Sequence, residues 1–389
     1  MKSSGLLILL CLICAASCSL HSSTESFKDD LVFTIKEVEY NYAGFPLLSE
    51  SEKAEYEAMK SAVRDSVDAG RYSAFDGAGH YLAWFQQRHL RTCWDDHNDL
   101  WKLPIDYAAS FPYDPQKVFC KVDDDTYLIR FPSCYGDPDG KWVKQSIKDY
   151  KASGCKYLIL DIRGNGGGSD HYYEPYLALL YDTPGVTDGV DFFYTKKNFR
   201  QMKKWVPIRM LILSIGKDKS KERVMWTFTK DRKIQYTSKS SFPVAAALII
   251  DNNVGSAGEA MVLDIRASSK RTTVYGRDNT YGCLDISNCR EVELPFRKNY
   301  ILVPMTVSHR LPDRGIDKEG IAPDVRLDIP YPTELTDNVD EWVLWIAKAL
   351  KKQRLKGTPR NHCPAALIKE CRVIMFIFYS TLKMWRMKL

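Results

Sequence analysis

A chain of 389 residues is long enough for about two domains, since domains commonly run to roughly 100–200 residues. Hydrophobic residues make up 45% and charged residues 27%, which excludes a disordered, collagen-like or coiled-coil chain. The net charge of +6 is small for this length, and no basic run flanks aromatic residues, so nucleic-acid binding is not expected. Hydrophobic residues are concentrated at both ends of the chain.

Residues 1–18 have the pattern of a secretory signal. Lys2 precedes the apolar run Leu6–Ala16, which is shorter than the roughly 20 residues that span a bilayer. The segment Ala15–Cys18 also resembles a bacterial lipobox, in which the cysteine is lipidated and becomes the new N-terminus, although Ala15 stands where leucine is commoner. We expect an exported protein: a periplasmic or outer-membrane lipoprotein attached to the membrane through Cys18, or a secreted protein.

Residues 19–116 are predicted to form an N-terminal helical subdomain. Apolar residues recur at helical spacing over Ser49–Leu103, with a second helical stretch at Gly79–Leu90. A connector that contains proline, Pro104–Pro115, follows.

Residues 117–335 are predicted to form an α/β core, because short apolar runs alternate with amphipathic helices. The runs Tyr157–Ile162 and Val244–Ile250 are continuous, as expected of strands that are buried on both faces. Further strands are predicted at Val118–Lys121, Thr126–Phe131, Val190–Tyr194, Ile208–Leu213, Lys233–Tyr236, Thr272–Tyr275, Val292–Leu294 and Asn299–Thr306, and helices at Trp142–Ala152, Tyr172–Tyr181 and Glu259–Ala267.

Residues 336–389 are predicted to hold a closing helix, within Glu334–Lys352, and a tail. The apolar part of Arg372–Leu389 is too short to span a bilayer, so a packed helix, an interfacial segment and a tail without function remain open. Outside the predicted signal, the cysteines form no C-x-x-C pair, which argues against a zinc or thioredoxin-type site. Export would permit disulfides, and Cys283 and Cys289 flank a predicted turn and could pair.

Two turns between a buried strand and a helix carry the candidate chemistry. The first, Asp161–Gly168, is rich in glycine, so its backbone amides can approach a ligand closely and can bind negative charge as a phosphate cradle or an oxyanion hole. The dinucleotide and P-loop fingerprints do not match. The second turn places Ser256 among small residues just before a helix, where it can be an exposed nucleophile or a simple helix cap.

Together these turns resemble the C-terminal-processing (tail-specific) serine peptidase family, which includes the tricorn protease core. Leu160–Gly168 is similar to the family's "LDLRGNGGG", Val254–Glu259 to its nucleophile turn, Gly276–Gly282 to its "GxxTxG" loop and Gly320–Val325 to its "GIxPDI". The resemblance covers about residues 79–330. It implies a serine peptidase with a crotonase-like ββα core, acting on protein or peptide substrates without a metal or other cofactor.

The resemblance leaves the base that activates Ser256 open between two histidines. Many relatives use a lysine directly after "GxxTxG", but Cys283 stands in that slot. The tricorn-like branch uses a histidine in an "FxDGHL" segment, which Phe85–Leu90 resembles, and this implies His89. Gln87 and Arg88 replace the usual acid and glycine, so His97 remains an alternative base.

By the same resemblance, Asp317 is the acid that orients the histidine, with Glu319 as an alternative. In the implied mechanism His89 takes the proton of Ser256, Asp317 holds the imidazolium, and the amides of Gly166, Gly167, Gly168 and Ala257 bind the oxyanion. Only a short segment separates His89 from the core, too short for the PDZ domain of about ninety residues that many relatives carry.

The main alternative is a catalytically inactive relative that binds a peptide or an apolar ligand with the same fold. The altered histidine segment and the absent lysine favour it, whereas the intact Ser256 turn favours the peptidase. The natural substrate and the oligomeric state cannot be inferred from the residues.

Overall fold

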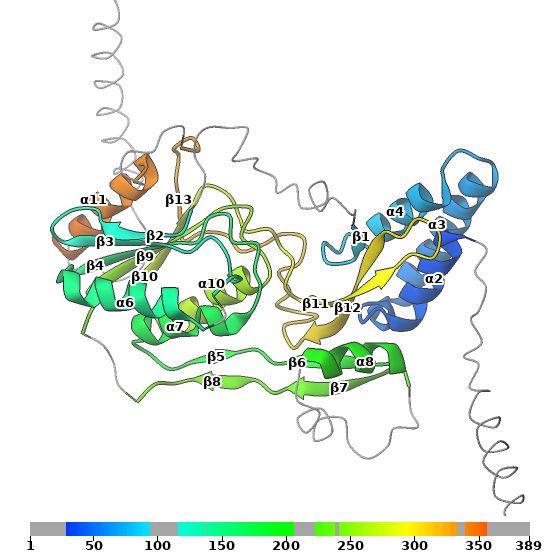
Figure 1. The fold of residues 1–389 in the computed structure, drawn as a ribbon, viewed down its shortest axis with the longest axis horizontal. Coiled ribbons are helices and arrows are strands. Elements are labelled where there is room, and N and C mark those ends of the chain that lie inside the picture. The colour runs from blue at the N-terminus through cyan, green and yellow to red at the C-terminus, as the bar shows by residue number, and fades with distance from the viewer. Residues whose placement is uncertain are drawn as a thin grey trace, which may run out of the picture.

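The computed structural model describes residues 29–93, 116–137, 139–205, 222–237, 241–332 and 339–355. Two packed units lie at opposite ends of the molecule, and two pairs of antiparallel strands, within residues 185–194 and 224–234, run along one side of them (Figure 1). One unit is a sheet with helices on both faces, and the other is a smaller sheet covered by the N-terminal helices. The mixed α/β class expected from the sequence is confirmed.

The larger sheet is built from six strands in the order β13-β10-β9-β4-β3-β2. All neighbours are parallel except β2 and β3, which form an antiparallel edge. The strands span β2 Val118–Lys121, β3 Thr126–Arg130, β4 Tyr157–Asp161, β9 Ala245–Ile250, β10 Thr272–Gly276 and β13 Val325–Arg326. The predicted strands in this part of the chain are thereby confirmed.

Helices cover both faces of this sheet because apolar side chains of its central strands point alternately to one face and to the other. In β4, Leu158 and Leu160 point to one cluster, whereas Tyr157 and Ile159 point to the other. The first cluster lies under α6 (Lys141–Ser153), α7 (Glu174–Leu180) and α10 (Ala257–Ser268), and α11 (Glu341–Leu355) covers the second. A short 3-10 helix, η2 (Asp170–Tyr172), precedes α7.

The smaller sheet is centred on β12 (Tyr300–Ser308), which pairs antiparallel with three other strands. Its further strands are β1 (Arg91–Cys93), β6 (Val190–Tyr194), β7 (Val224–Thr229) and β11 (Ile286–Glu293). A separate two-stranded ribbon joins β5 (Gly185–Thr187) to β8 (Arg232–Ile234), and α8 (Lys196–Trp205) follows β6. The predicted strand Ile208–Leu213 lies outside the described residues.

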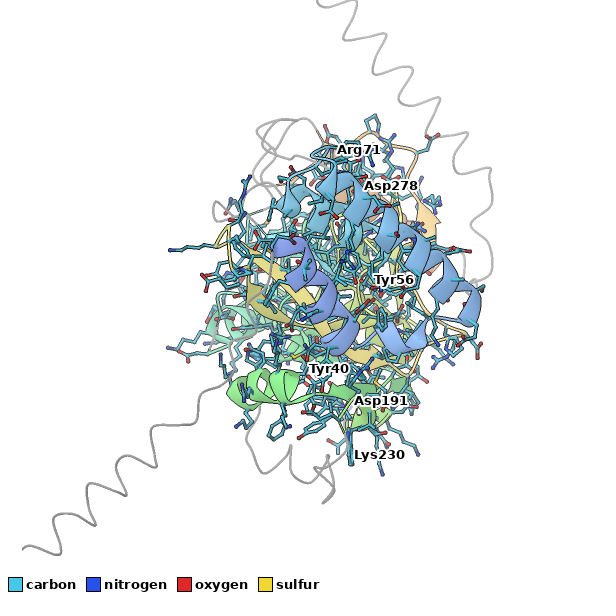
Figure 2. All side chains as sticks on the ribbon, turned by 90° about the vertical axis from the view of Figure 1, so that its right-hand side faces the viewer. Tyr40, Tyr56, Arg71, Asp191, Lys230 and Asp278 are labelled. Carbon is cyan, nitrogen blue, oxygen red and sulfur yellow. The ribbon has the colours of Figure 1, made fainter. Side chains whose placement is uncertain are left out.

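The N-terminal helices α2 (Asp30–Asn41), α3 (Glu50–Asp68) and α4 (Ala74–Trp84), with the 3-10 helix η1 (Phe45–Leu47), pack on β11 and β12 rather than forming a core of their own. Tyr56 of α3 lies at the centre of this packing (Figure 2), and its hydroxyl bonds Glu39 at 2.6 Å and Tyr81 at 3.0 Å. The helical pattern expected over Ser49–Leu103 is interrupted after Trp84, because Arg91–Cys93 pairs with β12. Residues 94–103 lie outside the described residues.

Six cysteines within the described part of the chain are free thiols, including Cys283 and Cys289. The suggested pairing of these two cysteines is therefore wrong. Cys289 lies beside the carbonyl of His89, whereas Cys283 lies beside Gly255. No helix among the described residues is long and apolar enough to cross a membrane. The N-terminal signal and the C-terminal tail lie outside those residues.

A buried ionic cluster fastens α11 to the end of β4. Arg163 donates to Asp161 at 2.7 Å and to Asp340 at 2.6 Å, and Arg130 contacts the same two carboxylates at 2.8 and 3.1 Å. All four side chains are buried, and the two arginines hold the pKa of Asp161 down at about 2 despite its burial. Each charge is thus compensated, as a buried ion must be.

We predict that Asp340→Asn lowers the free energy of unfolding by about 3–5 kcal/mol, because two buried arginines lose half of their negative charge. Asparagine keeps the cap that Asp340 provides to the amides of Trp342 and Val343, so the change isolates the charge. Urea unfolding measures the effect. Glu50→Gln, which breaks the exposed pair with Lys53, serves as the control and should cost less than about 1 kcal/mol. Equal losses in the two variants would contradict the role of the cluster.

Candidate active site

The two glycine-rich turns predicted from the sequence meet at one edge of the larger sheet. Strands β4 and β9 are parallel neighbours, with Asp161 opposite Ile249, so the turns that follow them start side by side. A Cβ atom built on Gly167 would lie 2.7 Å from Cβ of Ser256 and 2.9 Å from the amide nitrogen of Ala257. Only glycine permits this contact, and Gly167 also has a φ of +106°.

Ser256 stands directly before α10 with a φ of +51°, a backbone conformation that costs a non-glycine residue energy. The residue is half-buried, and its amide donates to Glu259 at 3.2 Å. Strained turns of this kind present a side chain at the start of a helix, where the helix dipole favours negative charge. Ser256 is also the N-cap residue of α10 and forms a capping box with Glu259, so this geometry accommodates both a cap and a nucleophile.

The four amides expected to bind an oxyanion divide into two pairs. The amide of Gly166 donates to the carbonyl of Gly164, and that of Gly167 donates to Oδ1 of Asn165. The amides of Gly168 and Ala257 have no acceptor among the residues that the structure describes. These two amides remain available to a ligand beside Ser256. Of the four candidate oxyanion donors, they are the ones whose hydrogen atoms are not already donated within the described residues.

Glu259 connects the nucleophile turn to the "GxxTxG" loop. Its buried carboxylate accepts hydrogen bonds from the hydroxyl of Thr280 at 2.6 Å and from the amides of Gly282 at 2.7 Å and Cys283 at 2.8 Å, in addition to that of Ser256. Burial raises the pKa of Glu259 to about 7, although these donors oppose the shift. The carboxylate thus sets the position of the serine backbone.

The last motif, Gly320–Val325, is connected to Glu259 through Thr280. Thr280, which donates to Glu259, accepts a hydrogen bond from the amide of Ile321 at 2.7 Å. Gly320 passes so close that a Cβ atom would lie 2.0 Å from the carbonyl oxygen of Thr280. On the opposite side, Asp251 accepts the amide of Gly164 at 3.2 Å and so ties the two turns together; burial raises its pKa to about 7.

His89 is buried just ahead of β1, and its Nδ1 lies 3.0 Å from the carbonyl oxygen of Ile286. A carbonyl can only accept, so Nδ1 carries the proton and Nε2 is left as the basic nitrogen. Burial lowers the pKa of His89 to about 4, which keeps the imidazole neutral near pH 7. The alternative base, His97, lies outside the described residues.

Asp317 contacts the segment around His89 rather than the imidazole itself. Its carboxylate accepts hydrogen bonds from the Gln87 amide at 2.6 Å and from the backbone amides of Leu284, Asp285 and Ile286 at 2.6, 2.7 and 3.1 Å. The direct Asp317–His89 hydrogen bond expected from the sequence is therefore not formed. The Nδ1 proton of His89 is donated to the carbonyl oxygen of Ile286 instead. The fallback acid, Glu319, has an exposed side chain.

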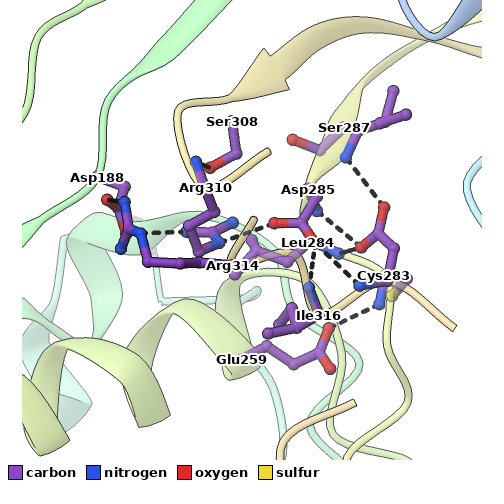
Figure 3. Close-up of polar contacts among 12 residues, drawn as sticks. Asp188, Glu259, Cys283, Leu284, Asp285, Ser287, Ser308, Arg310, Arg314 and Ile316 are labelled. Carbon is purple, nitrogen blue, oxygen red and sulfur yellow. Dashed lines mark hydrogen bonds and ion pairs between the residues drawn. The ribbon is translucent and has the colours of Figure 1, made fainter. Parts of the chain in front are cut away.

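Neighbouring polar contacts hold the same segment from the other side (Figure 3). Asp285 accepts Nε of Arg310 at 2.7 Å and the amide of Asp317 at 2.9 Å, together with the amide of Ile316. Residues 284–286 and 316–317 thus hold each other, because the carboxylate of Asp285 accepts amides of the second segment and the carboxylate of Asp317 accepts amides of the first. These reciprocal bonds fix the residue whose carbonyl receives the His89 proton.

Cys283 occupies the slot in which many relatives carry a lysine, and it cannot replace that base. The thiol of Cys283 packs against Gly255: a Cβ atom built on that glycine would lie 2.9 Å from the sulfur. Burial and the nearby Glu259 raise its pKa well above the ordinary thiol range, so the sulfur stays protonated. Among the described residues, no group of three or more His, Cys, Asp or Glu side chains could hold a metal ion.

Three residues of the site were not assigned a role from the sequence: Glu259, Gln87 and Asp251. Asp251 and Glu259 flank the Ser256 turn. A carboxylate within an otherwise small or apolar stretch is the sequence feature that could have indicated their roles. Gln87 was noted only as a departure from the family pattern. Its contact with Asp317 depends on a residue 230 positions away, which no local pattern reports.

The fold and this site define a hydrolase-type centre, with a strained serine at a strand-to-helix turn and two available amides beside it. The chain belongs to peptidase family S41, whose model matches residues 125–327, just over half of the sequence. It is accordingly a serine-type peptidase, and protein or peptide substrates follow from that membership. The family suggested by the four motifs is thus confirmed.

A solved structure has the same fold. A proposed peptidase from Parabacteroides merdae superposes with a TM-score of 0.53 at 18% identity, over 78% of this chain and 90% of the other. A lipoprotein from Streptococcus agalactiae (TM-score 0.47, 12% identity, 84% and 95% covered) and the photosystem II D1 C-terminal processing protease (0.34, 19%, 52% and 42%) are more distant. No curated protein matches the chain.

We predict that Gly167→Ala abolishes peptidase activity, because the added methyl group would push Ser256 and Ala257 away from the first turn. Gly166→Ala is the matched control: a Cβ atom there meets nothing within 4 Å, and activity should stay within about a factor of three. Hydrolysis of a casein substrate by the two purified variants measures the difference. Full activity in Gly167→Ala would show that the turns need not touch.

Proposed function

We propose that this chain is an exported serine endopeptidase that cleaves peptide bonds through an acyl-enzyme on Ser256. The observation that carries the proposal is the contact of Gly167 with Ser256 and Ala257, which leaves the amides of Gly168 and Ala257 available beside the serine. Such paired donors stabilise the oxyanion of acyl transfer, and one donor is worth about 10²–10³ in rate.

His89 is the general base in this proposal. With its Nδ1 proton donated to Ile286, Nε2 takes the Ser256 proton as the hydroxyl oxygen attacks the substrate carbonyl. The imidazolium then gives that proton to the leaving amine, and the peptide C–N bond breaks. Water, deprotonated by the same nitrogen, hydrolyses the ester and restores Ser256.

Asp317 supports His89 indirectly. Its carboxylate fixes the amide of Ile286, whose carbonyl holds the imidazole, and it fixes Gln87, whose side-chain oxygen accepts the amide of His89 at 3.2 Å. Ring and backbone of the histidine are both positioned by groups bound to one carboxylate. Asp317 is therefore a positioning residue here.

Export rests on the N-terminal sequence pattern of residues 1–18. We place the enzyme in the periplasm or at the outer membrane, attached through a lipid on Cys18, or outside the cell if the signal is simply removed. Loss of membrane association in Cys18→Ala would separate these locations.

A fluorophosphonate probe tests the nucleophile and the base. The wild-type protein should be labelled, Ser256→Ala should not be labelled at all, and His89→Ala should be labelled about 10²–10⁴-fold more slowly because the serine loses its base. His80→Ala, which removes an exposed histidine stacked on Tyr72, is the matched control and should be labelled normally. An unlabelled, folded wild-type protein would refute the peptidase mechanism; normal labelling of His89→Ala would move the base to another residue.

The protonation of His89 gives a second prediction. Its burial should shift its titration from about 6.5 to about 4, so the basic form persists as the pH falls through the range in which exposed histidines gain a proton. NMR of the histidine-labelled protein should show one imidazole that titrates near pH 4, and its signal should vanish in His89→Ala. A signal that titrates near pH 6.5 and is lost in that variant would contradict the buried, neutral base.

A further inference from the structure

A hollow of about 410 Å³ lies beside the proposed active site, between the end of α4 and the loops around residues 281 and 318. Its described lining holds three cationic side chains, two primary amides, one tyrosine and three apolar residues, but no aspartate or glutamate. The lining residues are Leu82, Ala83, Gln86, Gln87, Arg88, Leu90, Arg91, Tyr281 and Lys318. A concave site with this charge attracts anions.

The hollow adjoins the nucleophile turn through Tyr281. The amide of Tyr281 donates to the carbonyl of Val254 at 2.7 Å, and its Cβ lies 3.5 Å from a Cβ atom built on Gly255. The Cζ atom of the Arg88 guanidinium lies over the Tyr281 ring, 4.0 Å from its centroid, in a cation–π contact. Its positive charge reaches the turn as well, where it opposes the rise in the pKa of Cys283 that burial and Glu259 cause.

Among the described residues, no carboxylate forms an ion pair with Arg88 or Lys318. The carboxylate of Asp317 is occupied by Gln87 and three backbone amides. Glu52 is an acid whose pKa responds to Lys318. The hydrogen bond from the Ser49 hydroxyl lowers that pKa most, and the charge of Lys318 lowers it further. Glu52 and Lys318 nevertheless form no ion pair among the described residues. Arg88 likewise has no carboxylate partner in that part of the chain.

Backbone strain is concentrated at the same place. Six non-glycine residues in the described chain have a positive φ, and Gln86 at +49° and Lys318 at +76° both line the hollow, while a third is Ser256. Strained conformations of this kind persist where the surroundings enforce them, often at ligand sites. The hollow and the nucleophile turn therefore share this feature.

We infer that the hollow is a substrate subsite that binds a carboxylate of the peptide, with Arg88 as its main ligand and Lys318 as a second cation. The inference rests on the proposed peptidase function. The cation–π contact with Tyr281 holds the Arg88 guanidinium at the hollow, and a guanidinium can bind a carboxylate through two N–H groups at once. The carboxylate can belong to an aspartate or glutamate near the scissile bond or to the end of the peptide chain.

The test begins with a cleavage map. The full chain is incubated with a proteome-derived peptide mixture, cleavage sites are identified by mass spectrometry, and the best site is made as a quenched peptide in three forms. One form keeps all its carboxylates, one has glutamine or asparagine for the acidic residues, and one ends in an amide. We expect kcat/KM to fall about 10- to 100-fold in one of the two neutralised forms, which identifies the source of the carboxylate.

Variants assign that preference to the hollow. Arg88→Gln should lower kcat/KM about 10- to 100-fold for the carboxylate peptide and leave the matched neutral peptide within about twofold. Arg71→Gln, at an exposed site that does not line the hollow, should preserve the preference. Arg88→Lys keeps the charge without the planar fork and should show an intermediate preference. It also serves as the second variant should Arg88→Gln fail to fold, which circular dichroism shows.

Two outcomes would overturn the inference. A wild-type protein that cleaves all three peptides equally has no carboxylate subsite, and an unchanged preference in Arg88→Gln and Arg88→Lys would place the subsite elsewhere. Both leave the peptidase proposal intact. A folded wild-type protein that neither cleaves the mixture nor reacts with the fluorophosphonate would instead overturn the proposed function, and the subsite with it.

Discussion

Strands β4 and β9 lie side by side in the same direction, and the candidate active site depends on that pairing. Their carboxyl ends meet at one edge of the sheet, so the turn after β4 and the turn after β9 are brought into contact. The contact is closer than any side chain allows, because Gly167 faces Ser256 and Gly258 faces the carbonyl of Asn165. Displacement of either strand would separate the serine from the amides that serve it.

Buried carboxylates turn this contact into a rigid centre. Asp251 binds the first turn, Glu259 binds the serine and the following loop, and Asp317 binds the segment that leads to His89. Each is buried at a cost in free energy, which the raised pKa of all three records, and each recovers part of that cost from backbone amides. Because the donors come from different segments, the carboxylates hold those segments in one arrangement.

The proposed base and the proposed nucleophile belong to different packing units. His89 precedes β1 on one edge of β12, and Ile286 begins β11 on the other, whereas Ser256 belongs to the larger sheet. Residues 283–286 connect them, since Cys283 binds Glu259 near the serine and Ile286 holds the histidine. The cationic hollow lies at the same junction, where Arg88 rests on Tyr281.

The sequence by itself determined the α/β class, most strands and helices of the larger sheet, and the serine and glycine turns. These features are local: continuous apolar runs such as Tyr157–Ile162 predict buried strands, and small residues around Ser256 predict a tight turn. The start of α2 at Asp30 and the strand β1 were missed. A three-residue strand has no periodicity of its own and exists because β12 offers its free edge.

Only the tertiary structure decided which partners the polar residues choose. Asp317 and His89 were expected to bind each other, yet Gln87 and Ile286 lie between them, and Cys283 and Cys289 point to different neighbours rather than to one another. These choices depend on contacts between residues up to 230 positions apart, which the packing of the two units sets. Residue types at family positions therefore predict which side chains reach the site, while the hydrogen bonds among them follow from how the units pack.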